Sequence, residues 1–244
     1  MRAIFTFHSI DDSGSVLSYP IASFERLIAA LKANDIPIVD MKTLLSSNDK
    51  GVSLTFDDGM HSVHQHALPI LQRHQATAHV FVATQYIGTD KKWPESDINP
   101  SFDMLNWQQV EELHDAGWRI DAHTKTHPDL RQLTIDQVAK ECNEADAEIE
   151  QRLGRRPQYF AYPFGYHNGA VREFIGNSYL AAVTTELAYL ENQNEAVTLP
   201  RLDSYYLRSS WAINNIDSVM MKTYLGVRCW MRNIRRSQCV ADSD

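Results

Sequence analysis

Two carboxylates stand side by side at the end of an apolar stretch, in the segment Thr55-Phe56-Asp57-Asp58-Gly59. Adjacent carboxylates after a buried strand are costly unless water, a cation or a metal ion faces them. On an extended backbone the two side chains point to opposite sides, so one carboxylate could bind a metal ion while the other reaches water held by that ion. Gly59 lets the chain turn sharply afterwards. An Asp-Gly pair is also common in ordinary turns and helix caps, which stay an alternative for this segment alone.

Two histidines four residues apart form a second candidate, in the segment His123-Thr124-Lys125-Thr126-His127. At this spacing both imidazoles lie on one face of a helical turn and can reach one ion. Pro128 follows directly, which favours a loop at a strand end over a helix interior. The chain contains ten histidines, so a chance surface pair stays an alternative when the segment is taken alone.

The two segments together indicate a catalytic metal site. Asp58, His123 and His127 supply two nitrogens and one oxygen, and this set leaves coordination positions for water. A divalent ion held in this way lowers the pKa of its water to about 7 and polarises a substrate carbonyl. Asp57 could accept the proton of that water as a general base. The combination predicts metal-dependent hydrolysis of an acyl group.

The elements that must position these residues alternate between short apolar runs and helical patterns. Strands are expected at residues 3–7, 52–56, 76–83, 118–122, 159–162, 180–184 and 197–199. Helices are expected at residues 23–31 (capped by Ser23), 63–73, 106–116 and 134–153. Such alternation predicts an α/β fold with a mostly parallel sheet that could close into a barrel. Both candidate segments follow predicted strands, where folds of this kind carry their chemistry.

Length and charge restrict the class of protein. The 244 residues are expected to form one domain, 1–244, with a core from about residue 3 to 203 and a C-terminal tail from about 226 to 244. A net charge of −8 argues against a nucleic-acid partner. One basic stretch, from Arg228 to Arg236, is expected to be a solvated terminal segment, with contact to an anionic surface as the alternative.

Cysteine usage and hydropathy bear on the compartment. Cys142, Cys229 and Cys239 are an odd number without a CxxC pattern, which favours a reducing compartment. The first residues contain no apolar region of signal-peptide length, and no run of about 18 apolar residues predicts a transmembrane segment. These features predict a cytoplasmic location.

Three motifs of the sequence resemble those of the polysaccharide deacetylases of the NodB-homology group, carbohydrate esterase family 4. The segment TFDDG resembles the first family motif, HTKTH resembles the second, and FAYPFG at residues 160–165 resembles the third. The resemblance covers roughly residues 3–203. It implies a distorted (β/α) barrel with about seven parallel strands, fewer than the eight of a regular barrel.

The resemblance also implies roles for individual residues. Asp57 becomes the catalytic base, and the backbone N–H of Phe164 becomes a donor to the oxyanion, a role that side-chain changes do not remove. The implied cofactor is a divalent metal ion, Zn²⁺ in the first place, with Co²⁺, Ni²⁺ or Mn²⁺ as alternatives. Its implied ligands are Asp58, His123 and His127.

The sequence departs from the family pattern at two places. Ala161 stands where the third motif usually carries an arginine that supports the catalytic aspartate. Another arginine could take over that role: Arg155, Arg156 or Arg201. The late Leu-x-x-His motif that normally supplies the general acid is absent, since no histidine follows His167. His8, at the end of the first predicted strand, is the candidate for the acid or for a substrate contact; a histidine merely hydrogen-bonded at the barrel rim is the alternative.

The predicted function is metal-dependent removal of N-acetyl or related acyl groups from a carbohydrate. The expected substrates are acylated oligosaccharides, polysaccharides or lipid-linked sugars. The expected substrate contacts are Trp93, which lies in a polar loop, Tyr162, which could equally be a core residue, and Arg201, which could instead orient the base. Alternatives are an O-acetyl esterase or deformylase acting on a sugar, and a non-catalytic carbohydrate-binding protein with a relict site.

Overall fold

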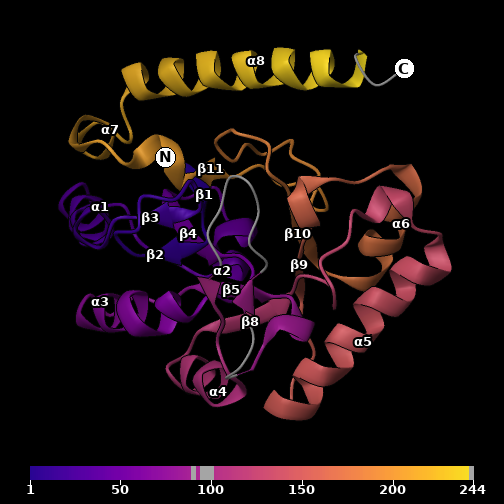
Figure 1. Cartoon of the computed structure of the whole chain (residues 1–244). Coiled ribbons are helices and arrows are strands. Elements are labelled where there is room, and N and C mark those ends of the chain that lie inside the picture. The colour runs from indigo at the N-terminus through magenta and orange to yellow at the C-terminus, as the bar shows by residue number, and fades with distance from the viewer. Residues whose placement is uncertain (89–91, 94–101, 242–244) are drawn as a thin grey trace.

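A sheet of seven parallel strands forms the centre of the molecule, as a computed structural model covering residues 1–88, 92–93 and 102–241 shows (Figure 1). The strand order is β10–β9–β8–β5–β4–β1–β11. The strands are β1 (Arg2–Phe7), β4 (Gly51–Phe56), β5 (His79–Val82), β8 (Arg119–Ala122), β9 (Tyr159–Ala161), β10 (Ala181–Val183) and β11 (Leu202–Asp203). Two small sheets pair β2 (Ser9–Ile10) with β3 (Ser18–Tyr19) and β6 (Lys92–Trp93) with β7 (Phe102–Asp103). The predicted fold class is confirmed.

One short segment connects the two edges of the curled sheet. Leu199 forms a parallel bridge with Val183 of β10, and Leu202 pairs with Phe5 of β1. A strand was expected at residues 197–199, but the strand lies at Leu202–Asp203. Pro200 explains the difference, because a proline has no N–H to continue a strand ladder. The segment therefore runs from the last strand to the first, which makes the barrel a distorted one.

Helices cover the outside of the sheet (Figure 1). They are α1 (Ile21–Ala33), α2 (Met41–Ser46), α3 (Leu68–Arg73, preceded by a π-helical turn at Val63–Ala67), α4 (Trp107–Asp115), α5 (Ile135–Leu153), α6 (Gly169–Ser178), α7 (Ser210–Asn214) and α8 (Val219–Ala241). Short 3₁₀ turns occupy Thr84–Tyr86, Leu130–Gln132, Pro163–Gly165 and Ser204–Leu207. The helices expected at 106–116 and 134–153 are confirmed, each with a capping box at its start.

One expectation about the start of a helix is wrong. Ser23 does not cap α1, because the helix begins two residues earlier, after Pro20, and Ser23 is buried within it. Pro20 is suited to that place, since its ring fixes φ and its missing N–H is not needed there. The basic stretch that begins at Arg228 belongs to α8, and its described residues are exposed or half-buried, while Met221 and Leu225, which precede it on the same helix, are buried in the main core. No helix in the described part of the chain is long and apolar enough to cross a bilayer.

Aromatic packing fixes the strands that lead into the site. Every residue of β4 is buried, as expected for a parallel strand covered on both faces. Phe7 stacks on Phe56 at a ring distance of 5.3 Å, and Phe56 stacks on Trp118 at 5.5 Å. His8 follows Phe7 and Asp57 follows Phe56 directly in the sequence, so this packing determines where both polar side chains emerge.

Candidate active site

The first candidate segment forms a tight turn at the end of β4. The N–H of Asp57 donates to the carbonyl of Phe7 at 2.9 Å, which continues the strand ladder by one residue. Asp58 and Gly59 then adopt left-handed conformations, with φ of 73° and 89°. A Cβ atom on Gly59 would lie 2.9 Å from the side chain of Ile87, so glycine is required there. The two carboxylates thus diverge because of a left-handed turn, not because of the extended backbone that the sequence suggested.

The second candidate segment is a loop after β8 and not a helical turn. Thr124 and His127 have positive φ angles of 66° and 57°. The Thr124 hydroxyl accepts the N–H of His127 at 3.0 Å, which closes the loop. The two imidazoles still meet, with ring centres 4.7 Å apart. The histidines therefore converge as predicted, and the segment is the strand-end loop that Pro128 indicated; the helical turn invoked for their shared face is wrong.

Glu141 of α5 holds this loop from behind. Its carboxylate accepts the backbone N–H groups of Lys125 and Thr126 at 3.1 and 2.8 Å and the Thr126 hydroxyl at 3.0 Å. A carboxylate that accepts three hydrogen bonds compensates for the strained backbone of the loop. Sequence reasoning did not single out Glu141, because an acidic residue in the middle of a long helix looks like solvated surface.

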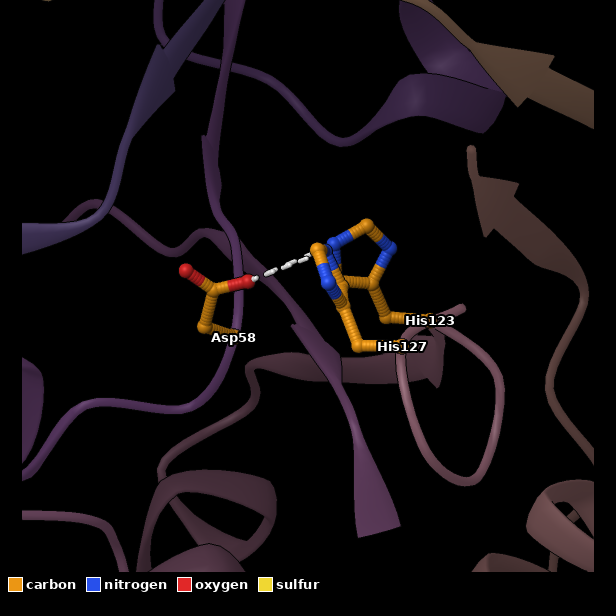
Figure 2. A group of neighbouring side chains, drawn as sticks. All are labelled: Asp58, His123 and His127. Atoms are coloured by element: carbon orange, nitrogen blue, oxygen red, sulfur yellow. Dashed lines mark ion pairs between the residues drawn. The ribbon is translucent and has the colours of Figure 1, made fainter. Parts of the chain in front are cut away.

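The side chains of Asp58, His123 and His127 point toward one another (Figure 2). One ligand atom from each lies within 4.8 Å of the others, and this is the one such group of His, Cys, Asp and Glu in the described part of the chain. Nε2 of His123 lies 3.4 Å and Nε2 of His127 lies 3.7 Å from Oδ1 of Asp58. These separations suit three donors arranged around a single small cation.

Hydrogen bonding and burial prepare the two imidazoles as ligands. Nδ1 of His123 donates to the carbonyl of Ala161 at 2.7 Å, which leaves Nε2 as the nitrogen that faces the group. Burial and the nearby His123 lower the pKa of His127 to about 4, so its imidazole is neutral at pH 7. Burial raises the pKa of Asp58, but the hydrogen bond with His123 and the charges of the histidines outweigh it, and the net shift is downward. The donor set therefore fits a divalent metal ion.

Asp57 is held by a buried arginine from the segment that joins the sheet edges. Nη1 and Nη2 of Arg201 donate to the two carboxylate oxygens of Asp57 at 2.7 and 2.6 Å. Nη1 also donates to Thr55 and Nε to the carbonyl of Thr184, at 3.0 and 2.9 Å. Burial raises the pKa of Asp57, but the charge and hydrogen bonds of Arg201 lower it well below its usual range. Asp57 is consequently an oriented, ionised carboxylate beside the Asp58–His123–His127 group.

A strained loop after β9 faces the same group. Phe164 is left-handed, with φ of 58°, and its ring lies 4.6 Å from the ring of His127. Gly165 is also left-handed, and a Cβ atom there would lie only 2.2 Å from Oγ1 of Thr185. Glycine is therefore required directly after Phe164, and the loop places the ring of Phe164 against that of the second histidine.

The sequence model of the polysaccharide deacetylase family matches residues 45–180, which contain all three candidate ligands, Asp57 and Phe164. The chain belongs to the polysaccharide deacetylase family. A putative polysaccharide deacetylase of Bacillus subtilis, YxkH, is 27% identical over 191 residues, which cover 75% of this chain and 64% of that protein. A poly-beta-1,6-N-acetyl-D-glucosamine N-deacetylase of Staphylococcus aureus is 24% identical over 215 residues, which cover 80% of this chain and 68% of that one. The predicted family membership is confirmed.

Solved structures of the family share the fold. The Streptococcus pyogenes deacetylase PplD, in complex with acetate, superposes with a TM-score of 0.72 at 23% identity, covering 83% of this chain and 91% of that chain. IcaB from Ammonifex degensii superposes with a TM-score of 0.73 at 22% identity, covering 87% and 98%. The distorted barrel is therefore the polysaccharide deacetylase fold.

Of the three arginines considered for the family's usual third-motif position, only Arg201 lies at the site. Arg155 is hydrogen-bonded to Gln158 on the surface, and Arg156 pairs with Asp146 at 3.2 Å. Arg201 itself is wholly buried and directed to Asp57, so its side chain is not presented to a substrate. The geometry supports its role in orienting the base over the role of a substrate contact.

The remaining predicted residues fall into three groups. His8 is partly exposed and directly follows Phe7, whose carbonyl accepts the N–H of Asp57, so it lies at the same edge of the sheet as the candidate base. Tyr162 does not reach a substrate: it is 1% exposed, and its hydroxyl donates to the carbonyl of Val197 at 3.0 Å. The expectation of a sugar contact at Tyr162 is corrected, because the residue fills the core beneath the third motif. The side chain of Trp93 lies outside the described residues.

Proposed function

We propose that this member of the polysaccharide deacetylase family is a metal-dependent hydrolase that removes N-acetyl groups from a glycan. The observation that carries the proposal is the convergence of Asp58, His123 and His127 beside a carboxylate, Asp57, that Arg201 holds in place. A relative named as an N-deacetylase of poly-beta-1,6-N-acetyl-D-glucosamine supports an N-acetylated glucosamine polymer, oligomer or lipid-linked sugar as the substrate class.

In the proposed mechanism of amide hydrolysis, each residue of the site has a separate role. A divalent ion held by the three ligands would polarise the acetyl carbonyl and lower the pKa of a water molecule. Asp57 accepts the proton of the attacking water, and Arg201 keeps its carboxylate oriented while it does so. The N–H of Phe164 donates to the oxygen that gains negative charge. His8 then protonates the departing nitrogen, so that acetate and a free amine result.

The arginine at Asp57 also weakens the alternative of a relict binding site. That alternative arose because Ala161 replaces the usual arginine of the third motif. The structure has a guanidinium on both oxygens of Asp57, supplied from the segment that joins the sheet edges. This arginine fixes the direction of the carboxylate, as a general base requires, and this supports a functioning base.

The proposal is tested by acetate release from N-acetylglucosamine oligomers and, in parallel, from O-acetylated oligosaccharides. The metal-stripped protein should be inactive and regain activity with Zn²⁺, Co²⁺, Ni²⁺ or Mn²⁺. Asp58→Ala should lose bound metal and activity together, whereas Asp57→Asn should keep the metal and lose at least about 10²-fold in turnover. His66→Ala, a histidine outside the group, is the matched control. Turnover that survives in Asp57→Asn, or acetate released only from the O-acetylated substrate, would contradict the proposal.

The role of His8 has a separate test. His8→Ala should leave metal content unchanged and lower turnover by about 10²-fold, because the departing amine then lacks its proton donor. The loss should be smaller on a substrate whose leaving group is a weaker base, such as a phenyl acetate ester. Equal losses on both substrates, or unchanged turnover on the amide, would remove His8 from the proton transfer.

A further inference from the structure

Helix α8 presents an apolar stripe to the solvent. Six of its side chains are between 37% and 77% exposed: Val219, Met220, Val227, Trp230, Met231 and Ile234. Intervals of seven, four and three residues place Met220, Val227, Met231 and Ile234 on one face of the helix, with Trp230 beside them. These six are half of the exposed large apolar side chains in the described part of the chain. Such a concentration of exposed apolar side chains on one helix is typical of a surface that binds another protein or a membrane.

The opposite face of α8 fixes the helix to the barrel. Met221 and Leu225 are buried in the main core, and Nη1 of Arg232 lies 3.8 Å from a carboxylate oxygen of Asp203, at the end of β11. In Figure 1, α8 (yellow) runs along one edge of the molecule, and no other element of the described chain lies beyond it. The apolar stripe is therefore not covered by any residue that the structure describes.

The charge of the helix differs from that of the rest of the chain. The sequence from Val219 to Ala241 contains Lys222 and four arginines and no acidic residue, although the chain as a whole has a net charge of −8. A helix with an apolar face that includes tryptophan, flanked by basic residues, has the chemistry of segments that lie in the interface of an anionic bilayer. A second copy of this chain that paired α8 with α8 would match the apolar stripe but would bring the positive charges of the two helices together.

We propose that α8 is an interfacial anchor that binds the surface of a membrane containing anionic lipids. Its stripe enters the boundary between headgroups and acyl chains, and its basic residues contact the lipid phosphates. The helix lies in the plane of the surface and does not cross the bilayer.

The anchor would hold the candidate active site near the membrane. Cys229 and Arg232 of α8 line a cavity of about 350 Å³ together with Gly165 and Thr185. Gly165 directly follows Phe164, whose ring contacts His127. The loop of the candidate site thus lies beside the same half of α8 that carries Trp230 and Met231, and a bound membrane would restrict the enzyme to glycans close to its surface.

The test is co-sedimentation of the purified chain with vesicles. Vesicles of phosphatidylcholine mixed with phosphatidylglycerol should bind the native chain, and vesicles of phosphatidylcholine alone should bind it weakly. The triple variant Val227→Ser, Trp230→Ser, Met231→Ser should reduce binding to the mixed vesicles at least about ten-fold, because the apolar contribution is lost. Leu180→Ser, which changes an equally exposed apolar residue outside α8, should bind as the native chain does.

Further measurements test the contribution of positive charge and exclude unfolding or dimer formation as the explanation. Arg228→Gln, at an exposed residue next to Val227 of the stripe, should weaken binding to the mixed vesicles about five-fold, and added salt should weaken it further. Circular dichroism and acetate release from a soluble oligomer should be the same for the triple variant and the native chain, which separates anchoring from folding and from the proposed catalysis. Failure of the native chain to bind the mixed vesicles would overturn the proposal. Binding by the triple variant at the native level, or a native dimer that the triple variant dissociates, would overturn it equally.

Discussion

Replacing Arg201 by methionine should cost both stability and turnover. The guanidinium is fully buried and makes four hydrogen bonds, two of them to Asp57. Methionine has a similar volume but leaves the Asp57 carboxylate buried without its counter-charge. Removing one partner of a buried ion pair typically costs ~3–5 kcal/mol, and we expect a loss of that size in the free energy of unfolding.

Turnover should fall by about 10²-fold in Arg201→Met, because the base is then free to move by an ångström or more from its working position. Metal content should not change, since Arg201 contacts Asp57 and none of the three candidate ligands. Arg201→Lys should give an intermediate loss, because lysine keeps the charge but cannot bind both carboxylate oxygens in a planar fork. Urea unfolding, metal analysis and acetate release from N-acetylglucosamine oligomers measure the three quantities.

A double-mutant cycle with Asp57→Asn isolates the pair. Each single substitution leaves one buried charge unpaired, whereas the double variant leaves none, so it should be no less stable than either single variant. The expected interaction energy is ~3 kcal/mol. Arg156→Met, which breaks the pair with Asp146 on the outside of the barrel, is the control. Additive losses in the cycle, or full turnover in Arg201→Met, would refute the assignment of Arg201 as the residue that holds the base.

Two further predictions concern a strained loop and a buried carboxyl. Gly165→Ala should reduce turnover at least about ten-fold and the free energy of unfolding by ~1–3 kcal/mol, because the added Cβ would clash with Thr185. Gly169→Ala is the control, since a Cβ there meets no atom within 4 Å; it should change neither turnover nor stability. Burial raises the pKa of Asp146 to about 6, above the unfolded value of about 3.9, so its contribution to stability is complete below pH 4 and is lost as the pH rises through 6. Asp146→Asn should therefore raise the free energy of unfolding by up to ~3 kcal/mol at pH 8 and change it little at pH 4. The asparagine can still accept the hydrogen bond from the Tyr179 hydroxyl. Equal gains at both pH values would contradict this prediction.

The candidate metal ligands could be predicted from the sequence because each lies in a short segment directly after a strand. The carboxyl ends of parallel strands meet at one edge of a sheet, so Asp58 after β4 and His123 after β8 had to come close once the alternation of strands and helices was recognised. The local backbone could not be predicted in the same way. Left-handed conformations at Asp58, Thr124 and His127 depend on tertiary contacts, such as the three hydrogen bonds to Glu141, that no local pattern reveals.

Burial was equally hard to predict for aromatic residues next to the motifs. Tyr162 belongs to the third motif and follows β9 directly, which suggested a contact with substrate. Its ring packs 5.3 Å from that of Phe160 and its hydroxyl reaches Val197, so it is a core residue with a satisfied polar end. Phe164, two residues later, is 52% exposed because the chain turns there into the left-handed region. A single backbone angle thus separates a core aromatic from one that faces the site.

The position of Arg201 in the fold explains how it can support the base although the third motif lacks its usual arginine. It lies 144 residues from Asp57, in the stretch that bridges β10 at Leu199 and pairs with β1 at Leu202. Because β1 is the direct neighbour of β4 in the sheet, a long side chain between these two contacts can reach the end of β4, where Asp57 stands. The third motif follows β9, which lies on the other side of β4 in the sheet. The absence of an arginine at Ala161 therefore does not remove the support of the base, since the stretch that joins the sheet edges brings an equivalent guanidinium to the same carboxylate.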